Sequence, residues 1–223
     1  MRIGINLLYF LPGISGGGET VALNLVPKVV ALDRRNEYFI FLNKENRFVF
    51  GFDQPNVTEI RCSVRAHSRA LRILWEQLTL PAQVRKYRLD LLHCPGITSP
   101  VISKCPVVVT IYDMNYRFHP ESYTRISYPF TRLFYSLSER CADKIIVISN
   151  SVKEDLIRLS NVPENKIEVV HLSADERFGR DIDRERVEHV TGKFGIRGRY
   201  ILCISTTHPH KNLARLLDAF LLL

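Results

Sequence analysis

The feature that most constrains the fold is a series of short apolar segments without polar alternation. Two of them, Val107–Tyr112 and Lys144–Ile148, are rich in Val and Ile. Such segments are typical of strands that are buried on both faces of a parallel sheet. The pattern predicts eight strands, at Arg2–Tyr9, Tyr38–Leu42, Val57–Cys62, Leu89–His93, Val107–Tyr112, Lys144–Ile148, Lys166–His171 and Tyr200–Ile204.

Helical patterns occupy the intervals between these strands. They predict helices at Glu19–Leu32, Ser68–Tyr87 with a break near Pro81, Tyr123–Cys141, Ser151–Leu159, Arg184–Phe194 and Asn212–Leu223. In the first helix the apolar residues near one stripe are Val21, Leu25, Val29 and Leu32. In the third helix the residues at helical spacing are Tyr128, Phe134, Leu137 and Cys141. The alternation of strand and helix predicts an α/β fold with a doubly wound parallel sheet.

A change of composition near residue 173 suggests a domain boundary. The chain is polar and charged between Ser173 and Gly198, and Tyr200–Ile204 then starts a new apolar strand. We therefore predict a first domain at 1–173, a linker with a helix at 174–198, and the first β–α unit of a truncated second domain at 199–223. A single β–α unit cannot bury its own apolar face, so we expect the sequence to be incomplete.

The charge of the chain is uneven as well as positive. The formal net charge is +8, and Arg61–Arg88 holds seven basic residues with Glu76 as its single acid. Because Leu71, Ile73, Leu74, Trp75 and Leu78 lie among these arginines, the stretch is either a solvated helix face or an interfacial helix on an anionic membrane surface. No nucleic-acid-binding motif accompanies it, and we predict no nucleic-acid partner.

Cysteine usage and the absence of a leader indicate the compartment. The five cysteines have no Cys-x-x-Cys spacing, which predicts reduced core thiols and no metal site. Residues 1–6 are too quickly polar for a secretory signal, and no apolar run reaches bilayer-spanning length. We predict a cytoplasmic protein, with peripheral attachment to the inner face of the membrane left open.

The loops that follow the strands are the candidate sites, since open parallel sheets bind ligands beyond the carboxyl ends of their strands. Gly16, Gly17 and Gly18 lie after the first strand and before a helix, where the backbone can approach a phosphate. A flexible β–α loop is the equally weighted alternative. The spacing matches neither a dinucleotide fingerprint nor a P-loop.

Other polar residues follow later strands. Tyr112, Asp113 and His119 come after Val107–Tyr112. Asp113 could orient a sugar hydroxyl or cap the following turn, and His119 could be an ordinary loop residue. Ser149 follows the next strand, and Ser151, with Glu154 three residues on, has the pattern of a capping box.

The last loop, Ser205–Leu213, places a cation at the start of a helix. Lys211 opposes the helix dipole there unless an anion also binds, which suggests that it faces a phosphate; an ordinary exposed lysine is the alternative. Ser205 begins this loop.

Taken together, these segments resemble glycosyltransferase family 4, the retaining enzymes of the two-lobed GT-B fold. The resemblance covers essentially the whole chain in order. The matching segments are Gly16–Gly18, Val-Thr-Ile-Tyr-Asp at 109–113, Lys-Ile-Ile-Val-Ile-Ser-Asn-Ser at 144–151, Lys-Ile-Glu-Val-Val-His at 166–171, and the Pro-x-Lys-Asn-containing segment at 200–213. Two departures from the family pattern are Tyr112, where many members have histidine, and Ser205, where many have glycine.

The resemblance implies metal-independent transfer of a sugar from a nucleotide sugar to a glycan or lipid-linked acceptor. It implies that Gly16–Gly18, Lys211 and Ser205 contact the donor diphosphate. We assign Tyr112 and Asp113 as candidate catalytic residues, and His119 and Ser149 to the acceptor side.

The family's Glu-x7-Glu motif lies outside the sequence, so we expect this chain alone to be inactive. The alternatives are a non-catalytic sugar- or nucleotide-binding lobe that acts through a partner, and a GT-B sugar-nucleotide epimerase.

Overall fold

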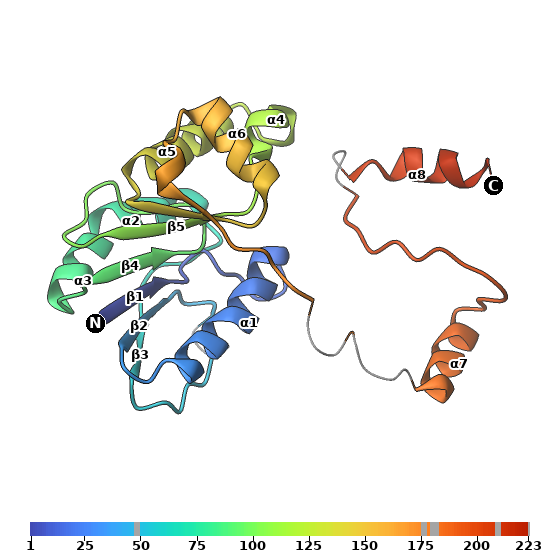
Figure 1. Ribbon diagram of the computed structural model, residues 1–223, viewed down its shortest axis with the longest axis horizontal. Helices are drawn as coiled ribbons and strands as arrows, with labels where there is room; N and C mark the ends of the chain where they lie inside the picture. The colour runs from blue at the N-terminus through green and yellow to red at the C-terminus, as the bar shows by residue number, and fades with distance from the viewer. Residues whose placement is uncertain (47–49, 175–177, 179–182, 208–210, 223) are drawn as a thin grey trace. The chain divides into compact units, whose positions relative to one another are not determined.

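The computed structural model describes residues 1–46, 50–174, 178, 183–207 and 211–222. The chain divides into two compact units, Met1–Leu172 and Ser173–Leu223. The first unit contains a seven-stranded parallel sheet with helices packed on it, and the described residues of the second form two helices (Figure 1).

The strands of the sheet lie in the order β3-β2-β1-β4-β5-β6-β7, and every neighbouring pair is parallel. Because β1 lies between β2 and β4, the chain runs from β1 toward one edge and then from β4 toward the other. Ile5 of β1 pairs with Ile40 of β2 on one side and with His93 of β4 on the other. The strands are β1 (Arg2–Asn6), β2 (Glu37–Leu42), β3 (Val57–Arg61), β4 (Leu91–Cys94), β5 (Val107–Ile111), β6 (Lys144–Val147) and β7 (Ile167–Val169).

Helices connect β1 to β2, β3 to β4, β5 to β6 and β6 to β7. Two of these connections also contain short 3-10 turns, η1 (Pro120–Ser122) between α4 and α5 and η2 (Glu164–Lys166) before β7. The α-helices are α1 (Gly17–Leu32), α2 (Arg69–Leu78), α3 (Leu80–Lys86), α4 (Asn115–Phe118), α5 (Ser127–Cys141) and α6 (Asn150–Ser160).

Two hydrophobic clusters cover the two faces of the sheet. Tyr38, Ile40 and Leu42 of β2 pack in the cluster that includes α1, while Phe39 and Phe41 pack in the cluster that includes α3. Since side chains alternate between the faces of a strand, both faces are buried. This confirms the doubly wound α/β fold that the apolar segments predict.

In two helices the buried face differs in part from the apolar stripe of the sequence. In α1 the buried residues are Ala22, Val26 and Val30, whereas Leu25 and Leu32 are exposed. Either stripe is apolar at helical spacing, and packing against the sheet selects the one shifted by a single residue.

In α5 the buried face is unexpectedly polar. It consists of Thr131, Tyr135, Ser138 and Glu139, whereas Cys141 is exposed. Cys62, Cys94 and Cys105 are free and buried as predicted, but Cys203 is exposed too. Side-chain hydrogen bonds with residues distant in sequence allow the polar residues to face inward, which local apolar spacing cannot indicate.

Two helix boundaries also differ from the sequence prediction. Ser149, not Ser151, is the N-cap of α6, and its hydroxyl accepts a hydrogen bond from the Val152 amide at 3.3 Å. The break in the predicted helix at 68–87 falls at Thr79, which places Pro81 in the first turn of α3, where its missing amide hydrogen costs little.

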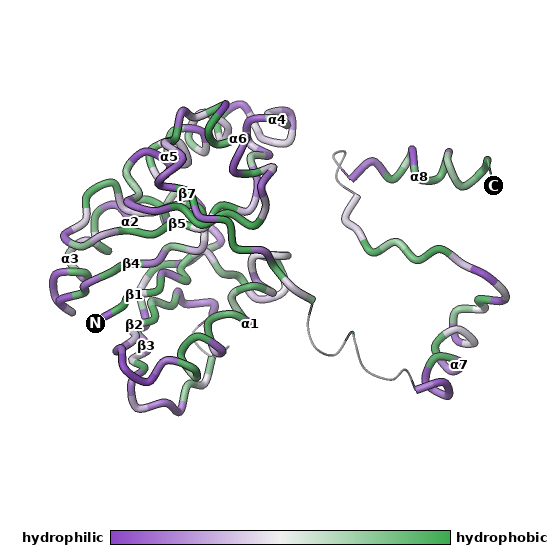
Figure 2. The backbone as a smooth tube through the Cα atoms, viewed as in Figure 1, coloured by the Kyte–Doolittle hydropathy of each residue, from purple (hydrophilic) through white to green (hydrophobic). Residues whose placement is uncertain are grey.

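The second unit contains α7 (Arg184–Lys193) and α8 (Leu213–Phe220). The predicted strand Tyr200–Ile204 is not formed: residues 200–204 are hydrophobic in Figure 2 but exposed and without regular structure. A strand requires a hydrogen-bonded neighbour, and within the described residues no strand pairs with this segment. None of the described helices is long and apolar enough to cross a membrane.

Candidate site at the switch point of the sheet

The strand order changes direction between β1 and β4, and open α/β sheets bind ligands outside the carboxyl ends of the strands at such a point. Tyr9 follows β1 and Gly96 follows β4. A Cβ atom on Gly96 would lie only 2.3 Å from Cδ1 and 2.9 Å from Cβ of Tyr9. The two loops therefore touch, and only glycine at 96 leaves room for the tyrosine ring.

The glycine loop forms the next part of this edge. Gly16 is the N-cap of α1, with a φ of 58° that favours glycine, and no side chain caps the helix. The Tyr9 hydroxyl donates a hydrogen bond of 3.1 Å to the carbonyl oxygen of Gly18. A Cβ on Gly18 would lie 3.5 Å from the Tyr9 ring and 3.8 Å from the Tyr112 ring. The structure thus brings the glycines and Tyr112, predicted separately from sequence, to one place.

Both tyrosines at this edge stay protonated near neutral pH. Burial raises the pKa of Tyr112 to about 12. Burial and, after it, the neighbouring Tyr112 raise the pKa of Tyr9. The Tyr112 hydroxyl is buried and makes no hydrogen bond of good geometry within the described residues. Chemically, a neutral phenol here can donate a hydrogen bond to an anionic oxygen, but it cannot act as a base.

A buried polar network supports the loop after β1, and the sequence analysis did not find it. Glu76 accepts hydrogen bonds from Arg72 at 2.6 Å, Thr98 at 2.8 Å and Asn6 at 3.2 Å. The Asn6 side-chain oxygen in turn accepts the Leu8 amide at 3.1 Å. The available signal was that Glu76 is the single acid in the basic stretch.

The other residues predicted after β5 and β6 lie in local interactions. Asp113 is exposed, and its Oδ1 accepts the Asn115 amide at 2.9 Å, which caps the following turn. Nδ1 of His119 lies 2.9 Å from the Glu121 carboxylate. Ser149 caps α6 as described above.

Ser205 and Lys211 belong to the second unit. Both are exposed, and the Ser205 hydroxyl donates to the Thr206 carbonyl oxygen at 3.0 Å. Their predicted convergence with Gly16–Gly18 on a diphosphate stays a prediction.

The basic stretch is only partly a surface. Ile73 is fully buried, Trp75 packs on the core and Arg72 is 5% exposed, so these three do not belong to an interfacial face. The exposed apolar residues of α2 are Leu71, Leu74 and Leu78.

Among the described residues, no three His, Cys, Asp or Glu side chains gather as a metal site.

Comparison with known proteins identifies related sequences and folds. The model of the family described as Glycosyltransferase Family 4 matches residues 15–178. No curated protein sequence gives a significant match.

Solved structures share the fold at low sequence identity. WaaG, a glycosyltransferase involved in lipopolysaccharide biosynthesis, has a TM-score of 0.61 at 13% identity, over 87% of this chain and 52% of that chain. Sucrose-phosphate synthase from Thermosynechococcus elongatus has a TM-score of 0.61 at 13% identity, over 85% and 52%. Anabaena Alr3699/HepE in complex with UDP and glucose has a TM-score of 0.54 at 16% identity, over 87% and 50%. The chain spans about half the length of these structures.

Proposed function

Because the chain belongs to glycosyltransferase family 4, we propose that it is the acceptor-side lobe of a retaining, metal-independent enzyme that transfers a sugar from a nucleotide sugar to a glycan or lipid-linked acceptor. The observation that carries this proposal is the uncapped glycine start of α1, which meets Tyr112 at the switch point of the sheet. Since the chain spans about half the length of the related structures, transfer is proposed for the whole protein, and residues 1–223 alone are expected to show no turnover.

In this proposal the donor diphosphate lies at the start of α1. The free amides and positive dipole end of a helix stabilise a phosphate, and no side chain makes a capping hydrogen bond at the start of α1. A Cβ on Gly17 would meet no atom within 4 Å, so the space beside it is open to a ligand. The protonated Tyr112 hydroxyl donates to the negative charge that develops on the departing diphosphate. Lys211 and Ser205 of the second unit are proposed as donor-diphosphate residues on the family resemblance alone.

The acceptor side is proposed along the carboxyl edge of β5 and β6. Asp113 orients an acceptor hydroxyl through the carboxylate oxygen that does not cap the turn. His119 and Ser149 line the same side.

A glycine substitution tests the diphosphate site without disturbing the fold. Alanine at Gly17, the first helical residue of α1, has room and should keep or slightly raise stability, because glycine is less favourable than alanine in a helix by about 1 kcal/mol. Its methyl group would occupy the space beside the phosphate, so Gly17→Ala should weaken UDP binding roughly tenfold, about 1.4 kcal/mol. Isothermal titration of UDP, GDP and ADP measures this.

Gly51→Ala is the matched control, since a Cβ there also meets nothing within 4 Å. It should bind nucleotide as the unchanged chain does. If no nucleoside diphosphate binds, or if both variants bind equally well, the proposed diphosphate site is wrong.

We also propose that the exposed face of α2 rests on an anionic membrane surface, which would bring the site to a lipid-linked acceptor. Leu71, Leu74 and Leu78 form its apolar row, with the basic residues of the stretch around them. Leu74→Ser with Leu78→Ser should reduce co-sedimentation with anionic vesicles several-fold. Leu32→Ser with Leu133→Ser, at two exposed leucines of α1 and α5, should leave it unchanged, and an equal loss in both pairs would contradict the proposal.

A further inference from the structure

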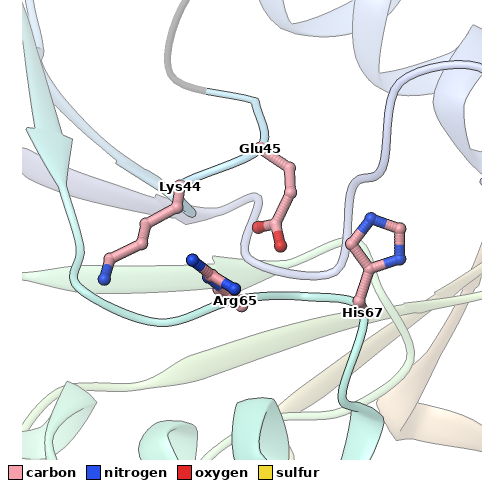
Figure 3. A pocket seen from close by; sticks show the side chains of 4 residues that line it. All are labelled: Lys44, Glu45, Arg65 and His67. Carbon is pink, nitrogen blue, oxygen red and sulfur yellow. The ribbon is translucent and has the colours of Figure 1, made fainter.

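A second polar site lies beyond the carboxyl ends of β2 and β3. The glycine loop lies beyond the carboxyl end of β1, at the same end of the parallel strands. The pocket has a volume of about 770 Å³ and is lined by Lys44, Glu45, Arg65 and His67 (Figure 3). Lys44 and Glu45 follow β2, and Arg65 and His67 follow β3. In Figure 3, Lys44 and His67 lie on either side of Glu45 and Arg65. The volume is in the range of small-molecule sites.

The backbone beneath this pocket is firmly held. The Lys44 amide donates to the Val64 carbonyl oxygen at 3.0 Å, and the Ala66 amide donates to Oε2 of Glu45 at 3.0 Å. These two hydrogen bonds join the loop after β2 to the loop after β3. A ligand in the pocket therefore binds without first ordering these loops, which limits the loss of conformational entropy.

Buried amides fix the β2 loop to the loop after β1. Asn43, which is 0% exposed, donates to the carbonyl oxygens of Leu8 at 2.9 Å and Phe10 at 2.8 Å. Asn46, also 0% exposed, donates to the Leu7 carbonyl oxygen at 2.8 Å. The pocket is thus built on the same loop that carries Tyr9, and the two sites share one framework.

The charges of the pocket are not balanced within the described part of the chain. Lys44 and Arg65 are the basic residues of the described lining, and within the described residues neither side chain forms an ion pair or a hydrogen bond. Glu45 is the one acid among the described lining residues, and one of its oxygens accepts a hydrogen bond from the Ala66 amide. Two neighbouring cations favour a bound phosphate, which accepts several charge-assisted hydrogen bonds, and the remaining carboxylate oxygen can accept a sugar or polyol hydroxyl.

We propose that this pocket binds the phosphate group of a phosphorylated sugar or polyol, and that this group is part of the acceptor. The assignment of the group to the acceptor rests on the proposed function, whereas the binding of a phosphate rests on the pocket alone. The phosphate belongs either to a free sugar phosphate or to a lipid headgroup, and both present the same anion to Lys44 and Arg65.

Nuclear magnetic resonance titration of the 223-residue chain tests the site directly. Glucose 6-phosphate should shift the amide signals of residues 44–46 and 64–67, and glucose should not. Lys44→Ala with Arg65→Ala should weaken binding at least tenfold, about 1.4 kcal/mol, since each substitution removes a charge-assisted hydrogen bond to the phosphate. Both side chains are exposed, so the melting temperature should change little.

The matched control removes two cations at the opposite edge of the sheet. Arg85 lies in the last turn of α3, which precedes β4, and Lys104 lies just before β5. Arg85→Ala with Lys104→Ala changes the net charge equally. This pair should bind glucose 6-phosphate within about twofold of the unchanged chain, a difference below 0.5 kcal/mol. Equal losses in both pairs would mean nonspecific attraction and would overturn the proposal, as would equal shifts with glucose.

A second experiment with lipid vesicles distinguishes a free sugar phosphate from a lipid headgroup. If phosphatidylglycerol vesicles, but not phosphatidylcholine vesicles, bind through Lys44 and Arg65 while glucose 6-phosphate causes no shifts, the phosphate is that of a lipid headgroup. If neither probe depends on these residues, the inference is wrong. UDP added to the same samples should shift Gly16–Gly18 independently, so failure of the pocket and failure of the donor site are distinguishable.

Discussion

The guanidinium of Arg72 and the carboxylate of Glu76 form an ion pair of 2.6 Å in which the two residues are 5% and 0% exposed. Their positions one helical turn apart in α2 allow the contact, and the packing of α2 on the sheet closes it to water. Through Asn6, the same carboxylate reaches the end of β1 and the loop with Tyr9. The pair therefore contributes to the placement of the switch-point site as well as to the core.

Removal of Glu76 should be strongly destabilising. Glu76→Ala leaves the buried Arg72 charge without its partner, and breaking buried pairs in this way costs roughly 3–5 kcal/mol. The free energy of unfolding in urea measures the effect. Asp155→Ala removes a partner of the more exposed Arg158 pair and should cost at most about 1 kcal/mol. Similar losses in the two variants would show that Arg72 is solvated.

A methyl group at Gly96 should displace Tyr9. Three atoms of the tyrosine, including its Cβ, lie within 3.0 Å of the added carbon, so a rotation of the ring alone cannot relieve the clash. Gly96→Ala should cost roughly 1–3 kcal/mol of stability, as overpacking does, and should also weaken nucleotide binding. In a double-mutant cycle measured by thermal unfolding, Tyr9→Ala should remove most of the cost. Additive effects would show that the two residues do not meet.

Stability should depend on pH through His93. Burial lowers its pKa to about 4, and Nε2 lies 2.9 Å from the Thr110 hydroxyl. The unfolded chain protonates this ring near pH 6.5 and the folded chain only near pH 4, so the folded state loses stability as the pH falls between these values. The loss approaches roughly 3 kcal/mol at the low end. Comparison of urea unfolding at pH 7 and pH 4.5 in the unchanged chain and in His93→Asn isolates this contribution, and identical pH dependences would contradict it.

The sequence was sufficient to predict the seven strands of the sheet because most of them are short apolar segments. It could not predict which stripe of α1 is buried, because Val21 and Ala22, Leu25 and Val26 are adjacent apolar pairs on neighbouring stripes. Only the shape of the sheet distinguishes them. The failure of Tyr200–Ile204 to form a strand has a similar origin, since a ladder depends on a partner that local sequence does not contain.

Local sequence likewise indicates some residues of the candidate site, whereas others depend on strand pairing. Gly16–Gly18 and Tyr112 were predictable, because each follows an apolar strand. Tyr9 and Gly96 were not, because their contact depends on β1 lying beside β4, a pairing of residues 88 positions apart. The pocket of Lys44 and Arg65 likewise depends on the pairing of β2 with β3 and on the loops that this pairing brings together.

Asn43 should be among the most costly polar residues to replace. Its amide donates to two carbonyl oxygens of the β1 loop, and its Oδ1 accepts the Glu45 and Asn46 amides, each at 2.8 Å. Asn43→Ala leaves all four groups without this partner in a buried place, which should cost roughly 2–4 kcal/mol at about 1 kcal/mol for each bond. Urea unfolding measures the loss, and faster hydrogen exchange at the Glu45 and Asn46 amides should accompany it. Asn24→Ala, which removes one side-chain bond to Thr20 within α1, should be nearly neutral because alanine is the better helix former. If Asn43→Ala unfolds at the same urea concentration as Asn24→Ala, water replaces the amide, and the rigid framework shared by the glycine loop and the cationic pocket does not exist.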